Sequence, residues 1–257
     1  MALLDDTGAA VAPLRRPARR VVSLVPSLTE AIAATGPGAL CGATDWCTHP
    51  ADLDVTRVRG TKNVDWRTVV ALGPDLVVAN KEENRELDVR RLREAGVPVW
   101  VTVIEDVPQA LASMGRLFTD ALGWGEPEWL SQVRSTWDRP VPASHTRVAV
   151  PIWRDPWMVV GSATYTGDLL ARAGFANVFG AHEGRYPHVE PAEIDGAGVD
   201  EVLLPDEPYE FTADDGPEAF ATPTRLVSGR LLTWYGPAML EAADLLLPDT
   251  ERHGRAQ

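Results

Sequence analysis

Lysine and cysteine are the rarest residue types in this sequence, with two of each. Of its 24 basic residues only two are lysines, Lys62 and Lys81, and both lie within a stretch of twenty positions. The compact ammonium of lysine and the planar guanidinium of arginine bind different groups. The two lysines therefore either reflect chance in an arginine-rich chain or mark a shared site.

Cysteine and long apolar runs are also scarce. The two cysteines, Cys41 and Cys47, would pair only if their connection folded back, so free thiols are expected. No window approaches the about 18 continuous apolar residues of a membrane span. The first residues are acidic, whereas a secretory signal begins with positive charge and an apolar run, so the sequence predicts a cytoplasmic protein.

An excess of positive charge is absent as well. The 257 residues carry a formal net charge of −13. Nucleic acids and anionic membrane surfaces both require a basic face, so we expect neither as a partner. We find no nucleophile elbow, phosphate-binding loop or HExxH motif, so nothing in the sequence requires catalysis. A small-molecule ligand is the expected partner.

Short apolar runs alternate with helical patterns along both halves of the chain. We predict strands over 21–25, 40–43, 75–79, 99–103, 148–152, 202–204 and 225–227. Such alternation indicates parallel sheets in an α/β protein. The sequence therefore predicts two Rossmann-like α/β lobes with parallel sheets, joined by a short helix over 126–138.

This alternation also divides the chain. We predict a flexible tail over 1–18, an N-terminal lobe over 19–122, a linking segment over 123–144, a C-terminal lobe over 145–247 and a tail over 248–257. Ligands of open α/β sheets bind outside the carboxyl ends of the strands. With two lobes, we expect the ligand in the cleft between them.

The predicted helix starts add candidate binding groups. Ser27 followed by Glu30 matches a capping box, which predicts Ser27 as the N-cap of the first helix. Free backbone amides next to Pro26 and Ser27 would then face a ligand. A later helix is predicted over 82–95, with Asn80 as its N-cap.

Both lysines follow predicted strands. Lys62 precedes Asn63, and Lys81 stands between Asn80 and Glu82. The positive end of a helix dipole favours Glu82 but opposes Lys81, so capping explains only part of this motif. We interpret these five residues as ligand-binding. Pairing of the lysines with neighbouring glutamates is the alternative.

An aromatic ring, a thiol and an imidazole follow the second predicted strand, at Trp46, Cys47 and His49. Cysteine and histidine bind soft or borderline metals, but two ligands do not make a structural zinc site. A metal would need a third ligand from elsewhere. The alternative is that Cys47 is a small buried apolar residue and that His49 bonds the backbone.

Aromatic residues gather in predicted loops of the second half. The chain has nine tryptophans, and several lie outside the periodic segments. An aromatic ring with a polar edge suits a ligand site, although core packing is the alternative. The candidates are Trp153, His188, Trp234 and Tyr235.

Four segments together resemble a known family. They are 20–30 (RVVSLVPSLTE), 69–79 (VVALGPDLVVA), 92–99 and 161–177. They are similar to landmarks of the helical-backbone metal-receptor superfamily, which includes the cobalamin- and siderophore-binding proteins of ABC importers. The resemblance implies two α/β lobes held by one long helix. It also implies a chelate ligand, such as a corrinoid, clasped by Trp46, Trp153, Trp234, Tyr235 and His188.

Three features depart from the transport members of that family. The chain begins without an export signal, and the predicted linking helix is short. The family docks on its permease through one glutamate in each lobe. Those positions fall here at Arg67 and near Ala192, where the neighbouring Glu193 could serve if the register shifts by one. A positive charge at Arg67 would oppose such docking.

Three functional hypotheses follow. The first is a cytoplasmic protein that binds a corrinoid, another metal chelate or a metal held by Cys47, His49 or His188. The second is the substrate-binding protein of an ABC importer whose export signal lies outside this sequence. The third is an enzyme that uses a lysine or Cys47 for covalent or acid–base chemistry.

Overall fold

The computed structural model describes residues 3–144 and 146–247, and the chain divides into two compact units. Unit 1 comprises residues 1–104, 108–134 and 235–237, and unit 2 comprises the remainder. The division therefore falls inside the predicted linking helix and again just before the last helix. The predicted tail 248–257 lies outside the described residues.

Within the described residues, unit 1 is built on a five-stranded parallel sheet in the order β3-β2-β1-β4-β5. The strands are β1 (Val21–Ser23), β2 (Leu40–Ala43), β3 (Thr56–Arg57), β4 (Leu76–Asn80) and β5 (Val99–Thr102). Four of them match predicted strands to within two residues at each end. The two-residue β3 was not predicted, because it is too short to show an alternating pattern.

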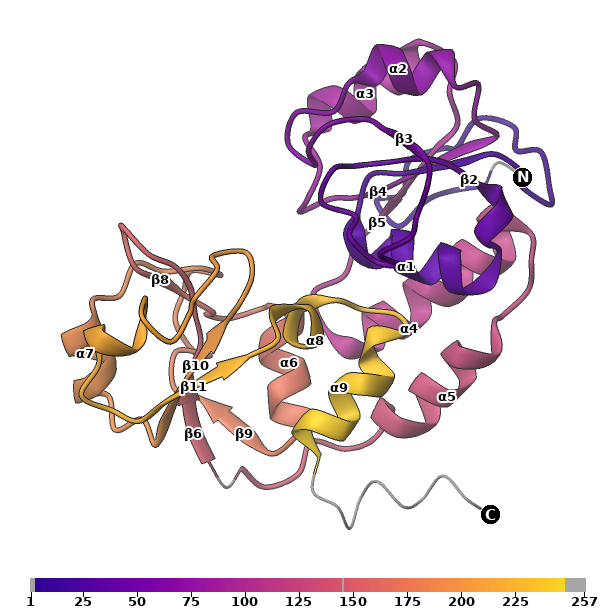
Figure 1. Cartoon of the computed structure of the whole chain (residues 1–257). Coiled ribbons are helices and arrows are strands. Elements are labelled where there is room, and N and C mark those ends of the chain that lie inside the picture. The colour runs from indigo at the N-terminus through magenta and orange to yellow at the C-terminus, as the bar shows by residue number, and fades with distance from the viewer. Residues whose placement is uncertain (1–2, 145, 248–257) are drawn as a thin grey trace. The chain divides into compact units, whose positions relative to one another are not determined.

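Helices cover both faces of this sheet, with α2 and α3 on one side and α1 on the other (Figure 1). The helices of the chain up to residue 137 are α1 (Pro26–Thr35), α2 (Trp66–Ala71), α3 (Glu86–Glu94), α4 (Val107–Arg116), a π-helical segment (Leu117–Leu122) and α5 (Glu128–Trp137). The short 3₁₀ turn η1 covers Pro37–Ala39. Because both faces are covered, the central strands are mainly apolar, as β4 illustrates with four apolar residues before Asn80, all five of them buried.

Two predicted helix starts are wrong. The N-cap of α1 is Val25, and Pro26 occupies the first helical position, where its missing N–H costs nothing. Ser27 therefore lies within the first turn instead of capping it. Helix α3 begins at Glu86 rather than at residue 82, because Asn80 and Asn84 hold residues 80–84 in a turn.

The described part of unit 2 contains a four-stranded parallel sheet in the order β11-β10-β6-β9 and the antiparallel pair β7-β8. The strands are β6 (Thr146–Ala149), β7 (Pro151–Trp153), β8 (Met158–Val159), β9 (Phe175–Asn177), β10 (Glu201–Pro205) and β11 (Thr224–Val227). The helices are α6 (Tyr165–Arg172), α7 (Pro191–Gly196), α8 (Gly229–Thr233) and α9 (Ala238–Leu246), with the 3₁₀ turn η3 (Pro217–Ala219). The predicted α/β class with two parallel sheets is thus confirmed.

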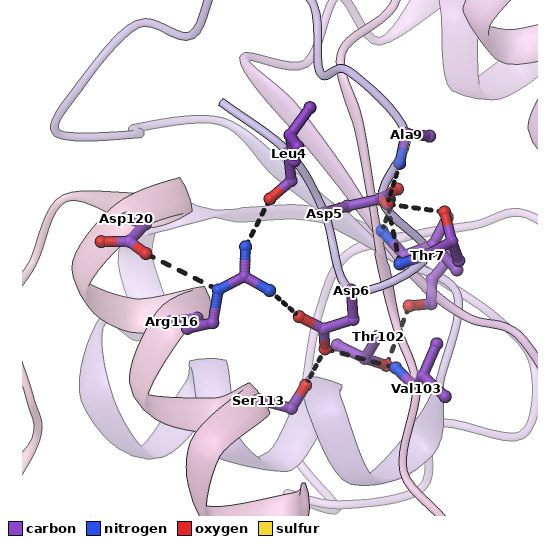
Figure 2. A network of polar contacts seen from close by, with 12 residues as sticks. Leu4, Asp5, Asp6, Thr7, Ala9, Thr102, Val103, Ser113, Arg116 and Asp120 are labelled. Atoms are coloured by element: carbon purple, nitrogen blue, oxygen red, sulfur yellow. Dashed lines mark hydrogen bonds and ion pairs between the residues drawn. The ribbon is translucent and has the colours of Figure 1, made fainter. Parts of the chain in front are cut away.

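The N-terminal residues differ from the predicted flexible tail. Residues 3–11 lie against the edge of the unit 1 sheet, where the Asp5 side chain is fully buried. Arg16 donates to the carbonyl of Asp120 at 3.0 Å, and Ala18 is also buried. The sequence suggested a tail because this segment has no helical or strand periodicity. Its order comes from polar contacts with distant residues, which Figure 2 shows.

One further structural fact concerns membranes. In the part of the chain that the structure describes, no helix is both long enough and apolar enough to cross a bilayer.

Asn84 provides a test of how the loops of unit 1 are held. Its buried side chain donates to the carbonyls of Leu24 and Thr61 at 3.1 Å each and accepts from the Asn80 amide at 2.9 Å. Asn84→Ala would leave these groups unsatisfied, and we expect the free energy of unfolding to fall by about 3 kcal/mol in urea titrations. The exposed neighbour Arg85→Ala is the control, with an expected change below about 0.5 kcal/mol.

Candidate functional site

The loops of unit 1 that follow its strands meet at the carboxyl edge of the sheet. Parallel pairing of β1 with β2 and β4 places these loops side by side. Asn84, in the loop after β4, bonds the backbone after β1 through Leu24 and the backbone after β3 through Thr61. Three loops that are distant in sequence are therefore tied together by one buried amide.

Both lysines belong to this set of loops. The Lys62 ammonium donates to the backbone carbonyl of Glu82. Lys81 is exposed, and its backbone N–H donates to the Thr102 carbonyl at 3.0 Å. The predicted proximity of the two lysine-bearing loops is therefore seen in the structure. The contact of Lys62 is with a carbonyl rather than a carboxylate, so its charge is not neutralised by that bond.

Asn80 has a structural role at the end of β4. Its side-chain oxygen accepts from the backbone N–H groups of Glu82 and Glu83 at 2.8 and 3.3 Å, and its amide donates to Thr102 at 3.1 Å. Asn80 is buried, so only its neighbours Lys81 and Glu82 present side chains to solvent. Asn80, one of the predicted ligand-binding residues, thus shapes the turn that carries Lys81 and Glu82.

Trp46 is the most exposed large apolar residue among those described, at 65%. It lies in the loop after β2 and packs against Gly60 in the loop after β3. A Cβ on Gly60 would come within 3.0 Å of the Trp46 indole nitrogen and 2.6 Å of Asn63 Oδ1. Asn63 accepts from the Gly60 N–H at 2.9 Å. Gly60 thus allows Trp46 and Asn63 to approach each other across these loops.

Tyr235 belongs to unit 1 although it is distant in sequence. Its hydroxyl donates to Glu83 Oε1 at 3.5 Å and lies beside Ser27 and Thr102. Burial raises the pKa of Tyr235 well above its ordinary value, and the nearby Glu83 charge raises this pKa further. The phenol is therefore neutral at physiological pH. Its polar neighbours come from the loops or helix starts after β1, β4 and β5.

The metal prediction at Cys47 and His49 finds little support in the local chemistry. The Cys47 thiol is fully buried, 3.0 Å from the Thr29 hydroxyl and 3.1 Å from that of Thr44. Burial raises the pKa of Cys47, whereas a metal ligand must be a thiolate. His49 is exposed. Among residues 3–144 and 146–247, no three His, Cys, Asp or Glu side chains are grouped to hold a metal.

In unit 2 an exposed tryptophan, Trp153, contacts the partly buried Tyr209 in the loop after β10. Trp153 ends β7 with 44% of its surface exposed, and its ring meets that of Tyr209 edge-on at 5.8 Å. The Tyr209 hydroxyl donates to Asp215 at 2.6 Å. Arg154 bonds Asp215 and also Glu218, at 2.6 Å from the latter. The charged cluster therefore holds the loop after β10 against the β7–β8 hairpin.

Glu207 follows β10 and lies beside α8. It accepts from the Thr233 hydroxyl at 3.4 Å and from the Trp234 side chain. Burial raises the pKa of Glu207, and the neighbouring Asp206 contributes in the same direction. Trp234 is itself buried, so its indole orients this carboxyl group while most of the ring packs in the interior.

The remaining predicted residue of unit 2 is His188. It is exposed and forms an isolated antiparallel bridge with Met158. The sequence interpretation missed Glu83, Thr102, Glu207 and Tyr209. All four lie near or after the carboxyl end of a predicted strand, so applying the strand-end rule to every strand would have included them. Glu83 was predicted to lie inside a helix that starts at residue 82, whereas α3 begins three residues after it, at Glu86.

Comparison with known proteins gives a consistent result. No family model matches the chain. The vitamin B12-binding protein of Vibrio parahaemolyticus is 22% identical over 189 residues, covering 69% of this chain and 67% of that protein. The periplasmic vitamin B12-binding protein of Vibrio cholerae superposes with a TM-score of 0.71 at 17% identity, covering 90% and 95% of the two chains.

This chain resembles the cobalamin- and siderophore-type binding proteins in sequence and shares their fold. A periplasmic haem-binding protein from Pseudomonas aeruginosa shares the fold at a TM-score of 0.71 and 22% identity, covering 89% and 91% of the two chains. At these identities the structural similarity establishes the fold, and the superfamily includes proteins named for more than one chelate. The resemblance seen in the sequence is therefore confirmed at the level of the superfamily.

The environment of Cys47 makes a chemical prediction. With its pKa raised by burial, Cys47 should stay unlabelled by iodoacetamide at pH 8 in the folded protein, as counted by peptide mass spectrometry. Unfolding in urea should expose it to complete labelling, and Cys41→Ser removes the second thiol from the assay. Labelling of Cys47 in the folded state at the rate seen in urea would contradict this assignment.

Glu207 makes a prediction about pH. A carboxyl group with a raised pKa binds its proton more tightly in the folded protein, so its effect on stability becomes less favourable as pH rises past the unfolded value. Glu207→Gln removes this ionisation. In urea titrations we expect the free energy of unfolding of the variant, relative to that of the parent, to be higher at pH 7 than at pH 4. An equal difference at both pH values would show that Glu207 titrates normally.

Proposed function

We propose that this protein is the substrate-binding component of an importer and that its substrate is a corrinoid or a related metal chelate. The observation that carries the proposal is an exposed tryptophan in each unit, Trp46 in the loop after β2 and Trp153 at the end of β7. An indole has an apolar face and a polar edge, which suits a ligand site, and a flat chelate offers a matching surface. Relatives named as vitamin B12-binding proteins support the same substrate class.

The polar groups of unit 1 suit a substrate with hydrogen-bonding side chains. Lys62 and Lys81 offer donors, and the carboxylate of Glu82 offers an acceptor beside them. Corrinoids carry amide side chains that use both kinds of group. A porphyrin with carboxylate side chains would use the lysines but would be repelled by Glu82 and Glu83. We therefore place corrinoids ahead of haem as the substrate class.

Docking on a permease and cellular location are separate parts of the proposal. Arg67 lies over the Trp66 ring at 4.7 Å, and the Glu193 carboxylate accepts from the Glu190 N–H at 3.0 Å. Unit 1 therefore has an arginine where docking on a permease would use a glutamate. In unit 2, Glu193 is a glutamate, and its carboxylate caps the start of α7. Export, which an importer component requires, competes with the sequence prediction of a cytoplasmic protein. Fractionation of the native host, with detection by antibody, distinguishes the two locations.

Titration of the purified protein tests the substrate class. We expect cyanocobalamin to bind, with calorimetry and absorbance giving the same stoichiometry. Trp46→Ala and Trp153→Ala should each weaken binding about tenfold, which corresponds to about 1.4 kcal/mol of lost contact. Leu87→Ala, which changes another exposed apolar residue, on α3, should leave the affinity unchanged.

The opposite results are equally informative. If cyanocobalamin, cobinamide and haemin all fail to bind, the chelate-binding function is wrong. If haemin binds and the corrinoids do not, the fold assignment stands but the substrate preference is reversed. If binding is unaffected by both tryptophan substitutions, the exposed indoles are not the contact surface.

A further inference from the structure

Strand β5 is an outer strand of the unit 1 sheet. Its sequence is of the kind that pairs readily with strands of other chains. Residues 99–103 read Val-Trp-Val-Thr-Val, without a charge, a proline or a glycine. Unprotected edges of this kind pair with strands of other chains, and proteins normally block them with charges or cover them. No charged side chain within β5 performs that task, so the protection comes from elsewhere in the chain.

Residues 3–11, here called the edge strap, lie along β5. The Asp6 N–H donates to the Val101 carbonyl at 3.1 Å. The Val101 N–H donates to Asp5 Oδ2, and the Val103 N–H donates to Asp6 Oδ2, both at 3.3 Å. Two carboxylates therefore accept hydrogen bonds from the outward-pointing N–H groups of β5. Without them, these N–H groups would be available to the carbonyls of a neighbouring strand.

The strap is held closed by its own backbone. Leu4 and Ala10 form an antiparallel bridge, and the Val11 N–H donates to the Leu3 carbonyl at 2.9 Å. Asp5 Oδ1 accepts from the backbone N–H groups of Thr7 and Ala9 at 2.9 and 3.1 Å. Asp5 thus folds the strap with one oxygen and bonds β5 with the other.

Two arginines fasten the strap to the helices beside the edge. Arg93 of α3 bonds Asp5 at 2.6 Å, where the Asp5 side chain is fully buried. Arg116 of α4 bonds Asp6 at 2.5 Å, and the Ser113 hydroxyl donates to the same carboxylate. Figure 2 shows Asp6 between Arg116, Ser113 and Val103, at the centre of the network. Replacing the two aspartates therefore removes both the hydrogen bonds to β5 and the ion pairs to the helices.

We infer that the edge strap keeps the protein monomeric by occupying the site at which β5 would pair with β5 of a second copy. A strand pairing with its own copy about a twofold axis is self-complementary, and the uncharged sequence of β5 sets no like charges opposite each other. The strap and a second copy would compete for the N–H groups of Val101 and Val103. This inference does not depend on the proposed substrate.

The test uses Asp5→Ala/Asp6→Ala in the full chain. Light scattering after size-exclusion chromatography, over a hundredfold range of concentration, should give a monomer for the parent and a concentration-dependent dimer for the variant. Hydrogen exchange at low concentration should show faster exchange of the Val101 and Val103 amides in the variant. The control is Asp120→Ala, which removes a carboxylate 3.8 Å from Arg116 that makes no contact with β5, and it should stay monomeric.

A further variant separates edge pairing from general loss of packing. Val103→Pro removes one outward N–H group, so adding it to the double variant should restore the monomer. Circular dichroism melts check that each variant is folded, and Asp6→Ala alone replaces the double variant if that one does not fold. A folded strap variant that stays monomeric, or a dimer that survives Val103→Pro, overturns the inference.

Discussion

Parallel pairing around β1 is the constraint on which the candidate site of unit 1 depends. Hydrogen bonding to β2 on one side and β4 on the other makes the strands end at the same edge of the sheet. The segments that carry Trp46, Lys62 and Lys81 are thereby brought to one edge, where Lys62 bonds the Glu82 carbonyl. The side chains on these loops then require only local adjustment to meet a common ligand.

The buried side-chain amides of Asn80 and Asn84 hold these loops in place. Asn84 and Asn80 satisfy backbone groups in four different loops or strands, and leaving such groups unpaired inside a protein is costly. The exposed residues beside them are therefore carried on a rigid base. In unit 2 the same purpose is served by charge, because Arg154 binds two carboxylates and holds the loop of Tyr209 against the hairpin of Trp153. A preformed surface loses less entropy when it binds its ligand.

The sheet that positions the site also creates an edge that must be covered. Strands buried on both faces are apolar throughout, so β5 cannot carry the charges that protect the edges of many antiparallel sheets. The protection comes from Asp5 and Asp6, whose carboxylates bond the backbone of β5 directly. An ordered N-terminal segment is thus a consequence of the parallel architecture.

Local periodicity and short motifs were enough to predict the α/β class and most strands of both sheets, and to indicate the resemblance to the cobalamin- and siderophore-type binding proteins. The sequence also placed the two lysines on strand-end loops, since parallel sheets allow that inference. Only the tertiary structure decided that Asn80 is buried, that Cys47 lies between two hydroxyl groups and that Tyr235 joins Glu83 in unit 1. The edge strap was invisible in the sequence for the same reason. Such contacts join residues as much as about 150 positions apart, and no local pattern records which distant partner will satisfy a buried polar group.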